Sequence, residues 1–270
     1  MNTTILTPMH FAHNYLINPT NAVSVNLIGA GGTGSRMLTA LAEMSHSLIA
    51  LGHAGLHVTL FDDDVITEAN LGRQRFAEAE LNLYKSVALI NRVNRFYGTN
   101  WKAITEKFER YPNGNLPEHA KANIYISCVD TVAARYEIAA VLKDLSEYRG
   151  YNSRDKGLYW MDFGNGQYSG QVLLSTITTI EQPASRQYQP VSALPLVTEE
   201  FKDLLAAQVD NNEPSCSLAE ALHKQDLFIN AALAADGASL LWSLFRNGMT
   251  DIRGFFKNLK EHRTQPIMVG

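Results

Sequence analysis

A glycine-rich segment near the start of the chain has the spacing of a phosphate-binding loop. Four glycines stand within six positions: Gly29, Gly31, Gly32 and Gly34. In such a loop the first glycine permits a tight turn, the second lets the backbone approach a phosphate, and amides of the next helix bind it. An apolar run precedes the segment and apolar residues follow it at helical spacing, which is the setting that the motif requires. The segment predicts a nucleotide site, and either NAD or ATP would fit it.

Carboxylates follow the next apolar run of the chain. Asp62 and Asp64 belong to three consecutive aspartates directly after residues 56–61. A carboxylate in this place can accept hydrogen bonds from the hydroxyls of a ribose. The separation of Gly34 and Asp62 exceeds the roughly 20 residues usual in dinucleotide-binding enzymes, which weakens the NAD interpretation.

Strand-like and helix-like stretches alternate through the first 150 residues. Strands are expected at 23–29, 56–61, 101–104 and 123–129, and helices at 35–51, 82–96 and 132–145. This alternation predicts an α/β fold with a Rossmann-like, doubly wound, mostly parallel sheet and helices on both faces. Ligands bind at the carboxyl ends of such strands, where the glycines and the aspartates fall.

The character of the chain changes after residue 150. We expect two strands joined by a glycine-rich turn within 159–177, a long surface loop at 178–195, a helix at 218–245 that Gly237 interrupts, and a short terminal element at 251–270. No linker divides the chain, so the prediction is one domain over 1–270. It would consist of a nucleotide-binding half, 1–150, and an appended C-terminal strand and helix half, 151–270, whose crossover loop is expected to help dock a partner.

The residues after the second expected strand carry a more specific pattern. The run from Leu60 to Gln74 reads LFDDDVITEANLGRQ. It closely resembles the signature D-x-D-x-V-x-x-x-N-L-x-R-Q, preceded by G-x-G-G-x-G, of the ThiF/MoeB/ubiquitin-activating-enzyme superfamily. Lys85 and Asp130 resemble the lysine and the aspartate that follow in that pattern. The C-terminal half looks most like the ThiF-family proteins of bacterial PRTRC systems.

This resemblance implies an adenylyltransferase that uses ATP and Mg²⁺ to activate the C-terminal carboxylate of a small ubiquitin-like, β-grasp protein. It implies Arg73 and Lys85 at the phosphates, Asn70 and Gln74 orienting them, Asp62 at the ribose with Asp64 beside it, and Asp130 as a Mg²⁺ ligand. The attacking carboxylate and the triphosphate are both anionic, so cations must offset their repulsion. Hard oxygen ligands such as Asp130 suit Mg²⁺.

The two cysteines receive different interpretations. Cys216 lies in Pro-Ser-Cys-Ser-Leu, which resembles the segment around the catalytic cysteine of ubiquitin-activating enzymes. We predict that it attacks the acyl-adenylate to form a thioester, because a cysteine near a helix N-terminus has a lowered pKa. Cys128 ends an apolar strand and is expected to be an inert core residue. The family's zinc site needs two C-x-x-C pairs, so no zinc is expected.

Composition limits the other functions. Lys and Arg number 23 against 27 Asp and Glu, which excludes nucleic-acid binding by bulk charge. The longest apolar stretch, 231–245, is too short to span a bilayer, and the N-terminus lacks the features of a signal peptide. We therefore expect a cytoplasmic protein with no membrane or nucleic-acid partner.

Several points stay open at this level. The resemblance implies a homodimer and a ubiquitin-like partner with a C-terminal glycine, and a conjugating-enzyme-like protein is a further candidate partner. Dimeric members often supply an arginine from an N-terminal helix; none precedes Arg36 here, so we hypothesise that Arg36 replaces it. The alternative functions are a sulfur-carrier-protein adenylyltransferase of the thiamine or molybdopterin type, an NAD-dependent oxidoreductase, and an inactive binding module on the same fold.

Overall fold

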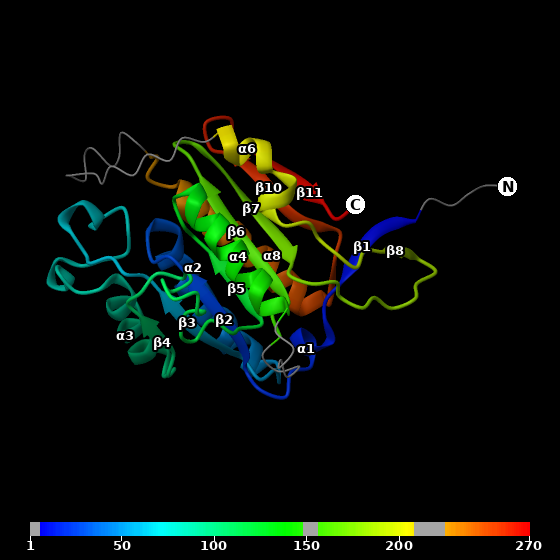
Figure 1. The fold of residues 1–270 in the computed structure, drawn as a ribbon, viewed down its shortest axis with the longest axis horizontal. Helices are drawn as coiled ribbons and strands as arrows, with labels where there is room; N and C mark the ends of the chain where they lie inside the picture. Colours follow the sequence, from blue (N-terminus) through cyan, green and yellow to red (C-terminus); the bar gives the residue numbers. More distant parts are fainter. Residues whose placement is uncertain (1–5, 148–155, 208–224) are drawn as a thin grey trace.

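A large β-sheet forms the centre of the protein (Figure 1). The computed structural model describes residues 6–147, 156–207 and 225–270. Within them the sheet has eight strands in the order β11-β10-β7-β6-β5-β2-β3-β4. The neighbours from β4 to β6 are all parallel, whereas β7, β10 and β11 join in antiparallel pairs.

The parallel strands are β2 (Val23–Ile28), β3 (Leu56–Phe61), β4 (Lys102–Ile104), β5 (Ile124–Ser127) and β6 (Tyr159–Asn165). The antiparallel strands are β7 (Ser169–Thr176), β10 (Ile252–Asn258) and β11 (Arg263–Met268). The sheet therefore runs without a break through both expected halves of the chain, and the terminal element is its antiparallel edge.

Helices cover both faces of the sheet. One apolar layer contains α2 (Gly32–Ala50), α3 (Lys85–Tyr97) and α8 (Ile229–Asn247); the other contains α4 (Val132–Glu147), α5 (Val197–Glu200) and α6 (Lys202–Ala207). Figure 1 shows α4 and α6 in front of the sheet and α8 behind it. In β5, Ile124 and Ile126 belong to the first layer and Tyr125 to the second. Burial on both faces explains why these strands are almost continuously apolar.

This architecture confirms the predicted fold class and most of the expected strands. The start of α3 is a correction, because the helix begins at Lys85 and not at residue 82. Asn82 has a left-handed φ of 67°, and Val65 pairs with Tyr84 in an isolated bridge. This pairing holds the residues before Lys85 against the loop that follows β3, so they cannot join the helix. That loop contains the short 3₁₀ turns η1 (Glu68–Asn70) and η2 (Glu78–Glu80).

The C-terminal helix also differs from the prediction. It begins at Ile229, residues 218–224 lie outside the described part, and Gly237 does not interrupt it. A Cβ at Gly237 would lie 2.5 Å from Cζ of Phe163 on β6. The glycine therefore lets the helix pack closely on the sheet, and this gain in packing outweighs its poor helix propensity.

A small second sheet joins the N-terminus to the rest of the fold. It has the order β8-β1-β9, with β1 (Thr7–Phe11), β8 (Tyr188–Pro190) and β9 (Met249–Thr250), and β1 leads into the short helix α1 (Asn14–Ile17). The expected surface loop at 178–195 is anchored here, because the Gln182 side chain bonds both the N–H (2.8 Å) and the C=O (3.0 Å) of Phe11. Ile180 and Leu194 of this loop are buried.

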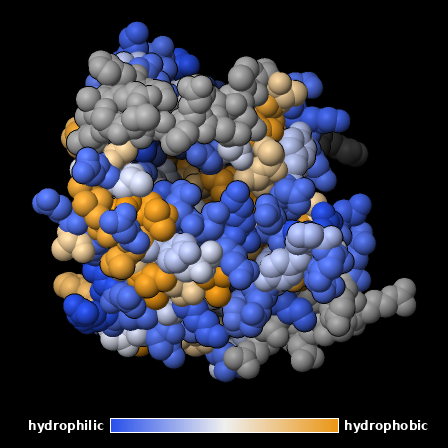
Figure 2. All heavy atoms as spheres, turned by 60° about the vertical axis from the view of Figure 1, so that its left-hand side comes forward, coloured by the Kyte–Doolittle hydropathy of each residue, from blue (hydrophilic) through white to orange (hydrophobic). Residues whose placement is uncertain are grey.

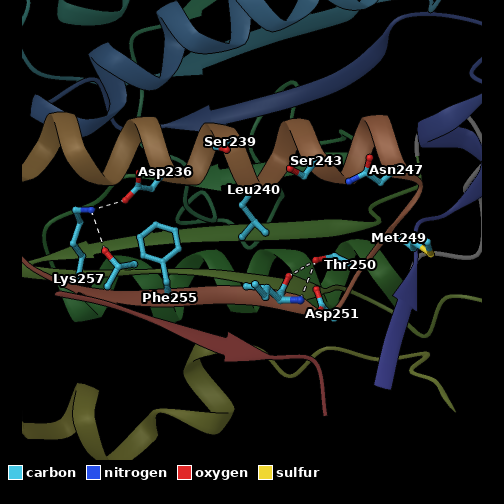
Figure 3. Close-up of a pocket in the computed structure, with 12 residues that line it drawn as sticks. Asp236, Ser239, Leu240, Ser243, Asn247, Met249, Thr250, Asp251, Phe255 and Lys257 are labelled. Carbon is cyan, nitrogen blue, oxygen red and sulfur yellow. Dashed lines mark hydrogen bonds and ion pairs between the residues drawn. The ribbon is translucent and has the colours of Figure 1, made fainter. Parts of the chain in front are cut away.

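Two surfaces stand out around this framework. The loop between β3 and α3 projects on the left of Figure 1 and comes forward in Figure 2, where hydrophobic and hydrophilic side chains gather in separate patches. On the other side, a groove of about 560 Å³ lies between α8 and β10 (Figure 3). The Lys257–Asp236 ion pair (2.7 Å) lies at one end of it, and the turn at Thr250 lies at the other. Within the described ranges, no helix is long and apolar enough to cross a membrane.

Candidate active site

Two loops meet where the order of the parallel strands reverses. β2 lies between β3 and β5; the loop after β2 leads to α2 on one face, and the loop after β5 leads to α4 on the other. The backbone links the two strand ends, because the N–H of Cys128 donates to Ile28 (2.8 Å) and that of Gly29 donates to Phe61 on β3 (2.9 Å). This reversal is where open α/β sheets bind ligands.

The glycine loop is held by close backbone contacts. Gly29 has a φ of +95°, and a Cβ there would lie 2.7 Å from the carbonyl oxygen of Cys128. A Cβ on Gly34 would lie 1.8 Å from the carbonyl oxygen of Gly29. Both positions therefore need glycine to keep the turn folded against the loop after β5.

The other two glycines have different surroundings. A Cβ on Gly32 would lie 2.5 Å from Nδ2 of Asn230 on α8, whereas nothing lies within 4 Å of a Cβ on Gly31. Gly31 is also the N-cap of α2 and has no side-chain cap, so the first amides of the helix can donate to an anion. The predicted phosphate approach therefore fits Gly31, while Gly32 serves helix packing.

Asp62 ties the end of β3 to the glycine loop. Its Oδ2 accepts a hydrogen bond from the N–H of Ala30 (2.6 Å), and its Oδ1 accepts one from the N–H of Asp64 (3.1 Å). Burial raises the pKa of Asp62 to about 6, and the charge of Lys85 opposes this rise. Each oxygen keeps a further lone pair, so the predicted ribose contact stays compatible with this arrangement.

Lys85 is a buried cation beside this carboxylate. It is the first residue of α3, and its Nζ lies 2.7 Å from Oδ2 of Asp64. The lysine side chain is 8% exposed and that of Asp64 is 66% exposed. A cation at a helix N-terminus is opposed by the helix dipole, so this placement is not explained by helix stability. An anionic ligand could replace the exposed Asp64 as the ion-pair partner of Lys85.

Arg73 presents a guanidinium that has no carboxylate at ion-pair distance among the described residues. Its Nη1 donates to Oε1 of Gln225 (2.8 Å), its buried Nε has no partner, and no ion pair of Arg73 occurs within the described ranges. Burial lowers the pKa of Arg73, and the charge of Asp130 opposes this effect. A partly desolvated cation with a free donor suits a phosphate.

Arg36 shows the same feature one turn into α2. Its Nε is buried and unpartnered in the part of the chain that the structure describes. Its pKa is lowered by burial and by the nearby charge of Arg75. The hypothesis that Arg36 contacts ATP stays untested, and the geometry leaves the donor free for that contact.

Asn70 and Gln74 shape the loop that carries Arg73. Oδ1 of Asn70 accepts from the N–H (2.9 Å) and the hydroxyl (3.1 Å) of Thr67, and its carbonyl accepts from the N–H of Gln74 (3.0 Å). Gln74 is buried, and its Oε1 has no partner among the described residues. The predicted contacts of both amides with phosphates remain a prediction.

The sequence analysis missed a polar chain that connects this loop to α8. Gln225 Oε1 accepts from both Arg73 and Nδ2 of Asn230 (2.8 Å each), and Oδ1 of Asn230 accepts from the hydroxyl of Thr33 on α2 (2.8 Å). Asn230 is 2% exposed. A buried amide at the start of an apolar helix is the signal that could have found it.

A second feature that the sequence did not reveal lies next to the loop of Asp130, a residue that is exposed after β5. Arg135 and Asp162 form a buried ion pair there, with Nε 3.0 Å from Oδ2. The signal was an aspartate inside the otherwise apolar run of β6.

The two cysteines differ in what the structure describes. Cys216 lies outside the described residues, so its predicted role is not tested. Cys128 packs against the core, and burial raises the pKa of its thiol, which agrees with the expected inert role.

Asp130 is the exposed carboxylate after β5 that could contribute to a Mg²⁺ site. No group of three or more His, Cys, Asp or Glu side chains that could hold a metal ion occurs in residues 6–147, 156–207 and 225–270. A single exposed carboxylate such as Asp130 suits Mg²⁺ that takes its remaining ligands from phosphates and water.

Comparison with known proteins identifies the family. The ThiF family model matches residues 16–264. The chain belongs to the ThiF family. No curated protein sequence matches this ThiF-family chain. Family membership supports the general activity that the resemblance implies, adenylation by an enzyme of the E1-like superfamily, while the PRTRC subfamily remains a prediction.

Solved structures show the same fold at low identity. PaaA matches with 13% identity and a TM-score of 0.57, over 92% of this chain and 73% of PaaA. E. coli MccB crystallised with MccA matches with 14% identity and a TM-score of 0.58, over 94% of this chain and 65% of MccB. The ThiF-family chain thus spans about two thirds of the length of MccB. At these identities the likeness shows a common fold.

Proposed function

We propose that this ThiF-family chain uses ATP and Mg²⁺ to adenylate the C-terminal carboxylate of a small ubiquitin-like protein that ends in glycine. The observation that carries the proposal is the half-buried guanidinium of Arg73, which has a free Nε and no carboxylate at ion-pair distance among the described residues. It is linked through Gln225 and Asn230 to the helix that follows the open turn at Gly31.

The residues present can divide the work of the first step. An oxygen of the partner's carboxylate attacks the α-phosphorus of ATP, the bond from that phosphorus to the bridging oxygen breaks, and pyrophosphate leaves. The turn at Gly31 and the first amides of α2 would bind phosphate oxygens, while Arg73 and Lys85 would offset the charge that builds up. When bound, Mg²⁺ would neutralise phosphate charge, with Asp130 as its ligand from the protein.

Cys216 would perform the second step. Its thiolate attacks the acyl carbon of the adenylate, a C–S bond forms, and AMP leaves with the oxygen that joined it to the acyl group. We further propose a cytoplasmic homodimer with the whole chain as one domain, which passes the thioester to a conjugating-enzyme-like protein. The choice of a polypeptide substrate is supported by a matching MccB crystal that contains selenomethionine-labelled MccA.

Pyrophosphate exchange tests the first step. The protein is incubated with ATP, Mg²⁺, labelled pyrophosphate and each small β-grasp protein that ends in glycine. We expect label to enter ATP only with the true partner, and not with the same partner after its C-terminal carboxylate is amidated. Absence of exchange with every candidate, together with tight NAD binding, would overturn the proposal.

The Cys216→Ala variant tests the second step. It should retain exchange but lose an adduct that thiols cleave, and Cys128→Ala is the matched control that should keep both. Exchange without any adduct in the unmodified protein would favour the sulfur-carrier alternative.

A further inference from the structure

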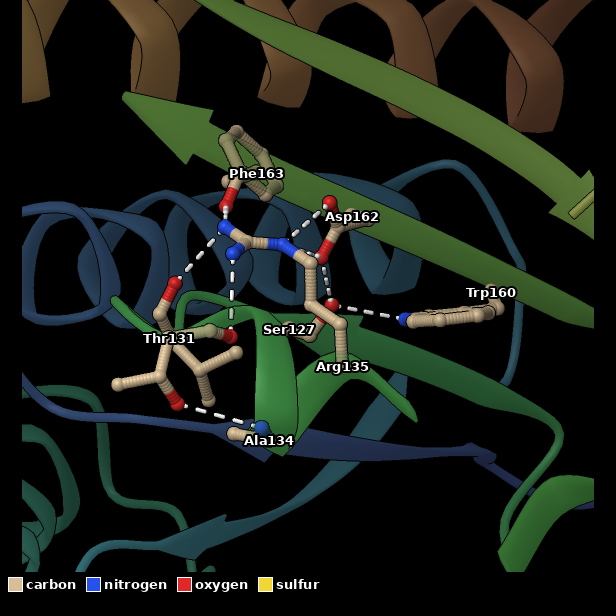
Figure 4. Close-up of polar contacts among 8 residues, drawn as sticks. Ser127, Thr131, Ala134, Arg135, Trp160, Asp162 and Phe163 are labelled. Atoms are coloured by element: carbon tan, nitrogen blue, oxygen red, sulfur yellow. Dashed lines mark hydrogen bonds and ion pairs between the residues drawn. The ribbon is translucent and has the colours of Figure 1, made fainter. Parts of the chain in front are cut away.

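A buried arginine clamps the loop that carries Asp130. Arg135 lies in the first turn of α4 and is 3% exposed (Figure 4). Its Nη2 donates to the carbonyl of Val129 (2.9 Å), and its Nη1 donates to the carbonyl of Thr131 (3.2 Å). One guanidinium therefore fixes the backbone on both sides of Asp130.

The same guanidinium is fastened to the neighbouring strand. Its Nε lies 3.0 Å from Oδ2 of Asp162 on β6, and its Nη2 also donates to the carbonyl of Phe163 (3.0 Å). Asp162 is 1% exposed, and its Oδ1 accepts from the hydroxyl of Ser127 (2.5 Å), which accepts from Nε1 of Trp160 (2.8 Å). Every nitrogen of the guanidinium thus donates a hydrogen bond and both oxygens of Asp162 accept one, and the clamp is tied to β5 and β6 at once.

Stability alone does not account for this pair. A buried ion pair is often no more stabilising than apolar residues of equal volume, because desolvation offsets the attraction. What a planar guanidinium supplies is direction, since its donors have a fixed geometry. β5 ends at Ser127, so the carbonyls of Val129 and Thr131 lie beyond its ladder, and Arg135 supplies their partner. A Cβ on Gly164 would lie 2.2 Å from Nε2 of Gln171 and 3.3 Å from Nη2 of Arg135, so a side chain there would crowd both.

We propose that Arg135, held by Asp162, is a positioning residue for nucleotide activation: it sets the place of the Asp130 carboxylate, and with it the affinity for Mg²⁺ in the ATP complex. This inference rests on the proposed function, because Asp130 is the metal ligand in that proposal. Residues that orient a metal ligand through a hydrogen bond typically change metal affinity by about 10- to 100-fold when they are removed.

Titration of Mn²⁺ with the protein and a non-hydrolysable ATP analogue, followed by electron paramagnetic resonance, measures this affinity without the reaction. In Arg135→Lys the charge opposite Asp162 is kept, but the lysine cannot reach both carbonyls. We expect its Mn²⁺ affinity to fall about tenfold or more, while affinity for the analogue without metal stays within about twofold. The double variant Arg135→Met/Asp162→Leu, which keeps an apolar core, should show the same loss if the lysine variant does not fold.

Arg110→Lys is the matched control. Arg110 also reaches α4, with Nε 2.7 Å from Asp144 and Nη2 3.1 Å from the carbonyl of Ala140, but away from Asp130. It should leave Mn²⁺ affinity unchanged. If Arg135→Lys lowers only the Tm and its folded fraction binds Mn²⁺ like the unmodified protein, the clamp is structural and the inference is wrong. If the unmodified protein binds neither analogue nor metal, the proposed function fails instead.

Discussion

The two loops that meet at the candidate site are held in place by different physics. The loop after β2 is fixed by its own backbone, because Gly29 and Gly34 allow contacts that no side chain could share. The loop after β5 has no such glycines and is fixed by the guanidinium of Arg135. The first arrangement depends mainly on two nearby glycines, with Asp62 after β3 as a further tie, whereas the second depends on one buried side chain and its partner on β6. One binding site thus combines loops that are held in two different ways.

The largest loss of stability should come from removing one partner of the Arg135–Asp162 ion pair and leaving the other. Arg135→Met leaves Asp162 buried without its counter-charge, so the free energy of unfolding should fall by about 3 to 5 kcal/mol. In the double variant with Asp162→Leu most of this loss should be recovered, because no unpaired charge remains. Urea denaturation of both variants measures the difference. Equal losses in the single and double variants would argue against the ion pair as the source.

The second largest loss of stability should come from substitution in the glycine loop. Gly34→Ala places a Cβ 1.8 Å from a backbone oxygen, and we expect a loss of about 3 kcal/mol in the free energy of unfolding. Gly31→Ala meets nothing within 4 Å, so its stability should change by no more than about 0.5 kcal/mol, while ATP affinity falls. Denaturation and ATP titration of this pair separate folding of the loop from phosphate approach. If Gly31→Ala binds ATP normally, the phosphate does not approach there.

Substitution of Arg73 tests the cation that is proposed to contact the phosphates. Arg73→Met should lower kcat/KM for pyrophosphate exchange by about 100-fold, as removal of a group that stabilises transition-state charge does. Its Tm should change little, because burial of a cation without a carboxylate partner among the described residues costs desolvation energy, and Oε1 of Gln225 keeps its bond from Asn230. The exposed Arg95, replaced in the same way, is the control and should keep full activity. A lower Tm with unchanged kcat/KM would assign Arg73 to folding alone.

The last prediction concerns the pH dependence of the glycine loop. The pKa of Asp62 is raised from 3.8 to about 6 in the folded protein, so the folded state binds its proton more tightly than the unfolded state. Its contribution to stability is therefore fully present below pH 3.8 and is lost as the pH rises through about 6. We expect the free energy of unfolding of the unmodified protein to decrease over this pH range relative to that of Asp62→Asn. Above the range the two curves of free energy against pH should be parallel. If the two curves of free energy against pH are parallel at every pH, the pKa of Asp62 is not raised in the folded protein.

The sequence was sufficient to predict those elements whose structure depends on neighbours along the chain. The strands before Gly29 and Asp62 were found because apolar runs and turn residues are local signals. The start of α3 was missed because the pairing of Val65 with Tyr84 competes with helix formation. Gly237 was misjudged because its close contact with Phe163 is tertiary, and propensity does not register such a contact.

The polar partners of the site escaped for the same reason. Asn230 and Thr33 are 197 positions apart, and Arg135 and Asp162 are 27 apart, so no motif links them. Their signal was a buried polar residue in an apolar element, which predicts a partner but not its identity.

The contact of Asn230 with the start of α2 also bears on how the protein is made. The ribosome adds about 5 to 20 residues per second, so Asn230 follows Thr33 by roughly 10 to 40 seconds. During that interval the glycine turn and its helix exist without the amide that bonds Thr33 and packs against Gly32. The nascent N-terminal half therefore lacks these two contacts of the glycine turn until α8 has left the ribosome.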